Sequence, residues 1–306
     1  INKIATDVCC YASLKKYKDF HYDIVVLDEA HHCFSEKRMA ALEELKNNLY
    51  PNSCVYLLSA TLSSAKVDMI ESIFGKFTIS TVTLKDAIKE DILPDPKVYV
   101  VGMELGDKRH DQLIKIGKYE STVKVKWENR MKYISRNIPC NIMCTQKQKY
   151  QYYTETMEYW KERYEHSKNE YHHNLWVNTG SMRKRYLGEQ KTADVYKFLD
   201  GMPSDKRYVC FCASVAQASM LGGKNTISSK RRSSVNQDII DSFNQKRINS
   251  IYAVGMITEG MNLNDIQVGI IVQLDGKERL FIQKIGRVLR ADSPVAVIFY
   301  YKNTQD

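Results

Sequence analysis

Short apolar runs alternate with helical patterns along most of the chain. The apolar runs lack polar alternation, which is typical of strands buried on both faces of a parallel sheet. They lie at residues 24–27, 54–58, 98–101, 207–212, 250–254, 270–274 and 295–300. Capping residues and helical spacing predict helices between these runs, at residues 36–49, 64–74, 84–93, 215–221 and 236–244. Strands that alternate with helices predict an α/β fold built on parallel sheets.

The middle of the chain differs in amino-acid composition from the segments on either side. Residues 104–190 are rich in Lys, Arg, Tyr, Asn, Gln and His, and stretches such as 150–164 predict helices. A solvated helical insertion that packs its own tyrosines explains this composition, but basic residues among aromatic ones also suit a nucleic-acid groove. We therefore expect three parts, at residues 1–103, 104–190 and 191–306.

Charge and cysteine content narrow the class of protein. The net charge of +9 suggests a polyanionic partner, and cationic clusters at 147–149, 183–185 and 230–232 are candidates for binding phosphates. The longest apolar runs fall far short of the roughly 18 residues that a membrane helix needs. The eight cysteines fit reduced thiols in a cytoplasmic protein, although Cys140, Cys144, His172 and His173 leave zinc as a less favoured alternative.

A cluster of polar residues directly follows the first strand. Asp28, Glu29 and His31 come at its carboxyl end, where open α/β sheets bind ligands. A carboxylate there can hold Mg²⁺ through water, and its neighbour can deprotonate an attacking water. A polar turn after a core strand explains the same residues. The next strand brings Ser59 and Thr61 to the same edge of the sheet.

A third stretch decides between these readings. Residues 283–290 read Gln-Lys-Ile-Gly-Arg-Val-Leu-Arg. Together with 28–31 and 59–61, this stretch resembles the QxxGRxxR, DEAH and SAT motifs of superfamily 2 helicases and nucleic-acid translocases. The resemblance implies two RecA-like parallel-sheet lobes, the first incomplete, with the helical basic insertion between them.

Weaker resemblances extend along the chain. Residues 10–14 are similar to the family's TYQSL segment, residues 84–94 to EAI-x-x-G-x-L of restriction-enzyme motors with Asp91 in place of Gly, and residues 145–152 to T-x-x-Q-x-x-x-Y of chromatin remodellers. Residues 207–214 are similar to IVFCxS, and residues 259–263 to EG-[IL]-[DN]-L. Residues 227–234 are similar to a phosphate-contacting segment, although a solvated charge run explains them as well.

The resemblance assigns roles by position. Asp28 holds Mg²⁺ through water, Glu29 activates the hydrolytic water, and Arg287 and Arg290 stabilise the transferred phosphoryl group between the lobes. The residues implied in ATP binding and lobe coupling are His31, Ser59, Thr61, Gly260, Asn262 and Gln283. The residues implied in nucleic-acid binding are Tyr11, Ser228, Lys230 and Thr258.

The phosphate-binding loop G-x-x-x-x-G-K-[ST] is missing upstream of Asp28, and no glycine precedes Gly75. We therefore expect a fragment of a longer motor, or one whose loop comes from another segment or chain, and expect these residues alone to be inactive. The function expected of the complete protein is an ATP-dependent helicase or translocase, on DNA rather than RNA. The alternative is a catalytically inactive helicase-like module that binds nucleic acid or serves assembly.

Overall fold

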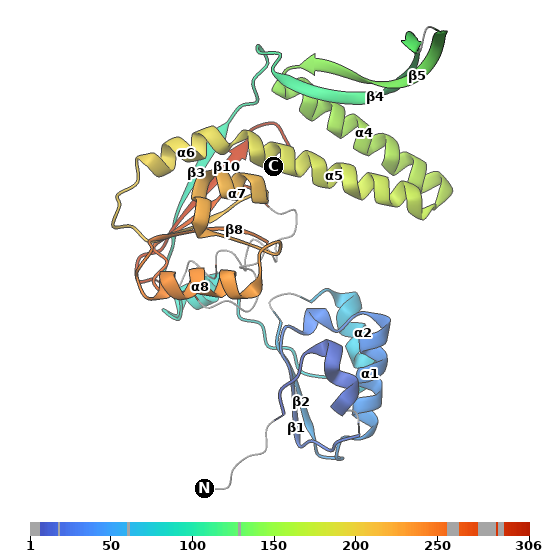
Figure 1. Cartoon of the computed structure of the whole chain (residues 1–306). Helices are drawn as coiled ribbons and strands as arrows, with labels where there is room; N and C mark the ends of the chain where they lie inside the picture. Colours follow the sequence, from blue (N-terminus) through green and yellow to red (C-terminus); the bar gives the residue numbers. More distant parts are fainter. Residues whose placement is uncertain are drawn as a thin grey trace. The chain divides into compact units, whose positions relative to one another are not determined.

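The computed structural model describes residues 7–17, 19–59, 62–127, 130–255, 263–274, 286 and 291–306, with the side chains of 84 and 118–139 left aside. The chain divides into two compact units, Ile1–Ala87 and Ile88–Asp306, and each is described by itself (Figure 1).

The first unit is built on a pair of parallel strands. Strands β1 (Ile24–Leu27) and β2 (Cys54–Leu57) pair in register, with Ile24 opposite Cys54. The helical segments are η1 (Tyr11–Tyr17), η2 (Ala30–His32), α1 (Glu36–Asn47), α2 (Ser64–Phe74) and the start of α3 (Leu84–Lys89). Val25 and Leu27 pack with residues of α1 and α2, among them Leu42 and Ile73, in one apolar core.

The expectation that β1 is buried on both faces is wrong for the described chain. Val25 and Leu27 are buried, whereas Ile24 and Val26 are 61% and 55% exposed. The reason is that successive side chains of a strand point to opposite faces, and the helices of this unit cover only one face.

The second unit contains a six-stranded parallel sheet, in the order β3-β10-β9-β6-β8-β7. Its strands are β3 (Lys97–Met103), β6 (Tyr208–Phe211), β7 (Thr226–Ser228), β8 (Ser250–Val254), β9 (Val268–Ile271) and β10 (Val295–Tyr301). Its helices include α6 (Thr192–Asp200), α7 (Val215–Gly222) and α8 (Ser233–Asn244), and the short η3 (Gly223–Asn225) precedes β7. All four residues of β9 are buried, so this sheet has the two-sided cover that apolar runs predict. The predicted α/β class with parallel sheets is confirmed.

One strand joins a different sheet from the one expected. The run at 98–101 was predicted to end the first α/β domain, but β3 pairs along its whole length with β10. The pattern of a strand predicts that it enters a sheet, not which sheet, because pairing partners are distant in sequence. Here the partner lies almost two hundred residues further along the chain.

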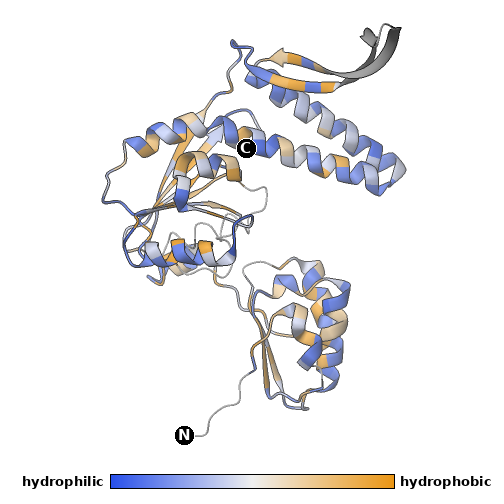
Figure 2. Ribbon diagram, viewed as in Figure 1, coloured by the Kyte–Doolittle hydropathy of each residue, from blue (hydrophilic) through white to orange (hydrophobic). Residues whose placement is uncertain are grey.

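The insertion is only half helical. Strands β4 (Gln112–Trp127) and β5 (Arg130–Cys144) pair as a long antiparallel ladder, which corrects the expectation of a helical segment throughout. The helices follow as α4 (Gln146–Ser167) and α5 (Glu170–Gln190), which lie side by side (Figure 1). Figure 2 shows α4 and α5 largely in the colours of hydrophilic residues, whereas the strands of the six-stranded sheet are largely hydrophobic.

Two short motifs of the sequence have local structural explanations. The Thr145-x-x-Gln148 pair forms a capping box at the start of α4, since the Thr145 hydroxyl accepts from the Gln148 amide and the Gln148 side chain accepts from the Thr145 amide. Asp91, which stands where the resembling motif has Gly, has a φ of 55°. Glycine enters that left-handed region freely and Asp tolerates it, so the two residues serve the same turn.

In the described part of the chain, no helix has both the length and the apolar character needed to cross a bilayer.

Candidate active site

The acidic turn after β1 has an unusual backbone. Glu29 has φ 48° and ψ 49°, the left-handed conformation, which costs a residue with a side chain roughly 1–2 kcal/mol. The Asp28 carboxylate accepts a hydrogen bond of 2.9 Å from the Glu29 amide, which holds the turn. Such strained residues cluster at active sites, because the surrounding structure must enforce them.

His31 connects the turns that follow the two strands. Its Nδ1 lies 3.1 Å from a carboxylate oxygen of Glu29 and 3.4 Å from the hydroxyl of Ser59. The His31 side chain is almost wholly buried, whereas that of Glu29 is 38% exposed. The structure therefore brings Glu29, His31 and Ser59 together at the carboxyl edge of β1 and β2, as the spacing predicted. Their roles in ATP binding and coupling stay predictions.

Tyr11 contacts the acidic turn through its hydroxyl group. Its hydroxyl donates a hydrogen bond of 2.6 Å to the Asp28 carbonyl, and burial raises the pKa of this phenol well above its usual value. Tyr11 therefore supports the acidic turn, and its contact with nucleic acid stays a prediction. No local pattern indicates this bond, which joins residues 17 positions apart.

The donor set of the turn fits Mg²⁺ held in the manner of nucleotide enzymes. Mg²⁺ there keeps several waters and is bound by one or two carboxylates together with substrate phosphates. Asp28 is an exposed carboxylate at the strand end, and among the described residues no group of three or more His, Cys, Asp or Glu side chains could hold a metal by itself. All eight cysteines are free thiols.

Several predicted site residues lie outside the described residues. These are Thr61, Thr258, Gly260, Asn262, Gln283, Arg287 and Arg290.

Two predicted phosphate contacts do not fit their positions. Ser228 is completely buried in β7, so it is not exposed to a nucleic-acid strand, whereas Lys230 is exposed two residues further on. Arg183, in the densest cationic cluster of the insertion, is also buried. It donates to the hydroxyl of Thr154 at 3.2 Å and to the side chain of Gln305. Both predictions failed because a hydroxyl or a charge in the sequence does not show which way its side chain points.

Sequence reasoning missed a buried ion pair at the end of the six-stranded sheet. The ammonium of Lys191 is paired with Asp306 and donates to the carbonyls of Val272, at 2.7 Å, and Phe299, at 2.9 Å. Both charged side chains are 0% exposed. Gln273 donates to the same carboxylate at 2.8 Å. No pattern near Lys191 indicates this pair.

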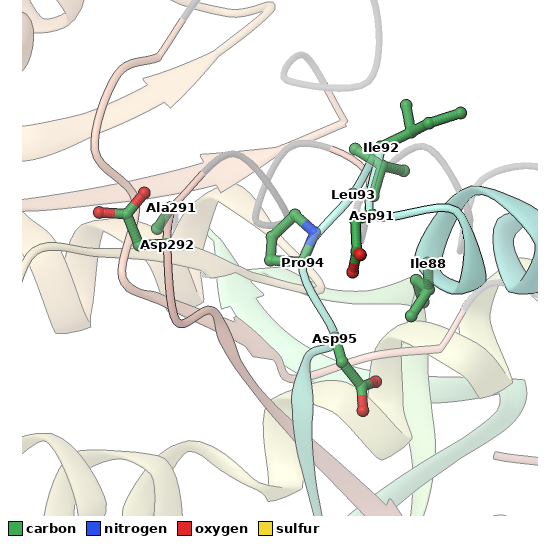
Figure 3. A pocket seen from close by; sticks show the side chains of 8 residues that line it. All are labelled: Ile88, Asp91, Ile92, Leu93, Pro94, Asp95, Ala291 and Asp292. Carbon is green, nitrogen blue, oxygen red and sulfur yellow. The ribbon is translucent and has the colours of Figure 1, made fainter.

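A shallow pocket of about 330 Å³ lies beside the start of β3 and close to the segment that leads into β10 (Figure 3). Its lining includes the carboxyl groups of Asp91, Asp95 and Asp292 and the apolar side chains of Ile88 and Leu93. Among the residues that the structure describes, neither Asp28 nor Glu29 lines it, and we assign it no role in the reaction.

Comparisons with known proteins bear on the second unit. Residues 190–292 match the family described as "Helicase conserved C-terminal domain". No curated protein matches the chain.

Solved structures give similarities of fold at low identity. S. cerevisiae Dbp5 bound to RNA and ADP BeF3 is 13% identical, with a TM-score of 0.48 over 92% of this chain and 54% of that chain. A DEAD box protein from the hyperthermophile Methanococcus jannaschii is 14% identical, with a TM-score of 0.40 over 92% and 54%. E. coli SrmB, a DEAD-box protein bound to the regulator of ribonuclease activity A, is 19% identical, with a TM-score of 0.33 over 37% and 72%.

The chain spans about half the length of the first two of these structures. The resemblance to restriction-motor or remodeller subtypes stays a prediction. The match over residues 190–292 supports the broader resemblance to superfamily 2 helicases, and the second unit contains a region that matches the helicase conserved C-terminal domain.

Proposed function

We propose that this chain is part of an ATP-dependent nucleic-acid helicase or translocase that acts on DNA. The observation that carries the proposal is the acidic turn, in which a strained Glu29 is held beside His31 and Ser59 at the carboxyl edge of a parallel sheet. The helicase conserved C-terminal domain supports it independently.

In this proposal the chain's own residues orient and deprotonate the attacking water. Asp28 contributes its carboxylate to a water-mediated Mg²⁺ site, and Mg²⁺ with ATP supplies the electrophilic phosphorus when bound. Glu29 accepts the proton of the attacking water, and its left-handed backbone fixes the direction of the carboxylate. His31 contacts both Glu29 and Ser59 through its Nδ1. Arg287 and Arg290 are proposed to stabilise the negative charge of the transferred phosphoryl group.

The exposed face of the first sheet supports a further part of the proposal. Ile24 and Val26 of β1, with Tyr56 and Leu58 in and just beyond β2, are all more than half exposed. Apolar strand faces are stable when they are covered. We propose that a further segment or an additional chain covers this face and supplies the phosphate-binding loop that residues 1–306 lack.

The test is Glu29→Gln in the protein completed with its phosphate-binding loop. The substitution keeps size and hydrogen bonding but removes the base, so ATP turnover should fall by about 10²–10⁴-fold while ATP binding stays. The matched control is Glu43→Gln on the exposed side of α1, which should leave turnover unchanged. If Glu29→Gln retained wild-type turnover, the assignment of Glu29 would be wrong. Absence of turnover in the unsubstituted, completed protein would favour the inactive binding module.

A further inference from the structure

The two helices of the insertion form an arm, α4 and α5, whose exposed sides differ in charge. Helix α4 carries Glu155, Glu158, Glu162 and Glu165, all exposed. Helix α5 has no acidic residue from Tyr171 to Gly188. Helix α4 also carries Lys147, Lys149, Lys161 and Arg163, so it presents both signs of charge, whereas α5 carries only basic charges from Tyr171 to Gly188.

The exposed residues of α5 from Tyr171 to Arg185 form one stripe, which we term the acid-free face, and the exposed Glu170 precedes it at the start of the helix. Its polar members are Asn174, Asn178, Ser181 and Arg185, and all of them are exposed. Tyr171, Val177 and Met182 complete the stripe and are also exposed. Spacings of three and four residues place these positions on the same side of a helix. Amide, hydroxyl and guanidinium groups without carboxylates suit contact with phosphate and sugar.

Several Tyr and Trp rings of the arm pack against other rings of the arm, which limits their stacking on bases. Trp160 stacks on His172 with ring centroids 5.8 Å apart, and Tyr164 stacks on Trp176 at 6.1 Å. Tyr153 packs against the buried Tyr186 at 5.7 Å. Single-strand binding relies on such rings as stacking platforms, so the arm is better suited to the backbone of a duplex. Its 21 residues give α5 a length of about 32 Å, close to one turn of a DNA duplex at about 34 Å.

The base of α5 is fixed to the carboxyl edge of the six-stranded sheet. A Cβ on Gly188 would lie 2.1 Å from the Cβ of Ala213, just after β6, so helix and sheet are in close contact there. The side chain of Gln217 donates to the Gly188 carbonyl at 2.7 Å, and the buried Lys191 follows directly. Ligands of α/β sheets bind at the carboxyl edge. Arg185 is the member of the acid-free face that lies nearest to this fixed end along the helix.

We propose that the acid-free face of α5 is a binding surface for the backbone of a DNA duplex. The inference rests on the proposed function in one respect, because that function makes nucleic acid the partner. It goes beyond it in assigning the contact to a helix of the insertion, outside the segments that resemble family motifs for nucleic-acid binding.

The experiment measures equilibrium binding of a fluorescent 20-base-pair DNA duplex to the full chain, without nucleotide, over a range of salt concentrations. The variant Asn174→Glu/Asn178→Glu adds two carboxylates to the acid-free face. The matched control, Gln151→Glu/His166→Glu, adds two carboxylates to exposed positions of α4. We expect Kd to rise about fivefold or more for the α5 variant and less than about twofold for the control, because only the first places charge against phosphates.

A third variant measures, from the salt dependence of Kd, whether Arg185 contacts one phosphate. Arg185→Gln should lower the slope of log Kd against log salt by about 0.9, the value for one phosphate contact. Thermal melting of each variant should match the unsubstituted chain, because all five positions are exposed. Equal weakening by the α5 variant and the control would show an effect of net charge alone and would overturn the proposal. A larger loss for a single strand of the same length, or no duplex binding, would overturn it too.

These outcomes are separate from those of the ATPase test. Binding is measured without nucleotide, so an inactive Glu29 site leaves it unaffected. If the completed protein hydrolyses ATP but the α5 variant leaves its duplex affinity unchanged, only the proposed binding surface on α5 is overturned.

Discussion

The two parallel sheets of this protein differ in how much of their apolar surface is covered. In the first unit, β1 alternates between buried and exposed residues although its sequence is uniformly apolar. In the second unit, the equally apolar β9 is buried at every position. The difference lies in the neighbours, because among the described residues β1 has one parallel partner and helices on one face, whereas β9 lies between β10 and β6.

The polar groups at the carboxyl edges of the two sheets differ in the same way. At the first edge, the Glu29 side chain is partly exposed and its backbone is strained. At the second edge, Lys191 and Asp306 are fully buried and hydrogen-bonded. A strained, accessible carboxylate is arranged for chemistry, whereas a buried, satisfied pair holds neighbouring elements together. Charged residues at similar places in two α/β sheets thus serve different ends.

Breaking the buried pair should have the largest effect. Lys191→Met removes the ammonium and leaves the Asp306 carboxylate buried without its charge partner, which should cost the second unit about 3–5 kcal/mol of unfolding free energy. Denaturant unfolding followed by tryptophan fluorescence measures this, because all three tryptophans lie in this unit. The control is Lys302→Met, whose half-exposed pair with Glu104 at 3.9 Å should contribute less than about 1 kcal/mol. Equal losses for the two variants would show that Lys191 is not an anchor.

Substitutions of the adjacent residues Val25 and Val26 test directly whether only one face of β1 is buried. Val25→Ala removes buried methyl groups and should destabilise the first unit by about 2 kcal/mol, whereas Val26→Ala should change its stability by less than about 0.5 kcal/mol. Hydrogen exchange of the α1 amides reports the stability of this unit. In a protein whose β1 face is covered, Val26→Ala should become as costly as Val25→Ala. Equal costs in the present chain would contradict the one-sided burial described above.

The elements that the sequence predicts well are those coded by local patterns. Helix α2 begins at Ser64 and ends at the Gly75 cap, and β8 and β10 match their apolar runs. The acidic turn and Ser59 meet as expected, because parallel strands bring their carboxyl ends to one edge. The ladder of β4 and β5 was missed although Val123-Lys-Val-Lys-Trp127 alternates with the period of a strand. The polar and basic composition of this segment favours a solvated helix, whereas its period is that of a strand.

What the sequence could not show depends on distant contacts. Lys191 binds carbonyls 81 and 108 residues further along the chain, and β3 finds its partner at β10. Arg183 looks like a surface cation in sequence but is buried by contacts with Thr154 and Gln305. Such contacts are decided by packing between elements, and no spacing rule within one element contains them.

The prediction with the smallest expected effect concerns the backbone strain of Glu29. It tests whether this strain is retained for function at the expense of stability. Glu29→Gly removes the steric cost of the left-handed backbone, so the first unit should become more stable by about 0.5–1 kcal/mol even without the carboxylate. The contact with His31 that is lost is partly exposed and contributes little. Hydrogen exchange of the α1 amides measures the gain, and Glu29→Gln serves as the control because it keeps a side chain and hence the strain. In the completed protein the glycine variant should be as inactive as the glutamine variant. A more stable yet inactive variant is the result expected where backbone strain positions a reactive group, and a less stable glycine variant would mean that the Glu29 side chain holds the turn together.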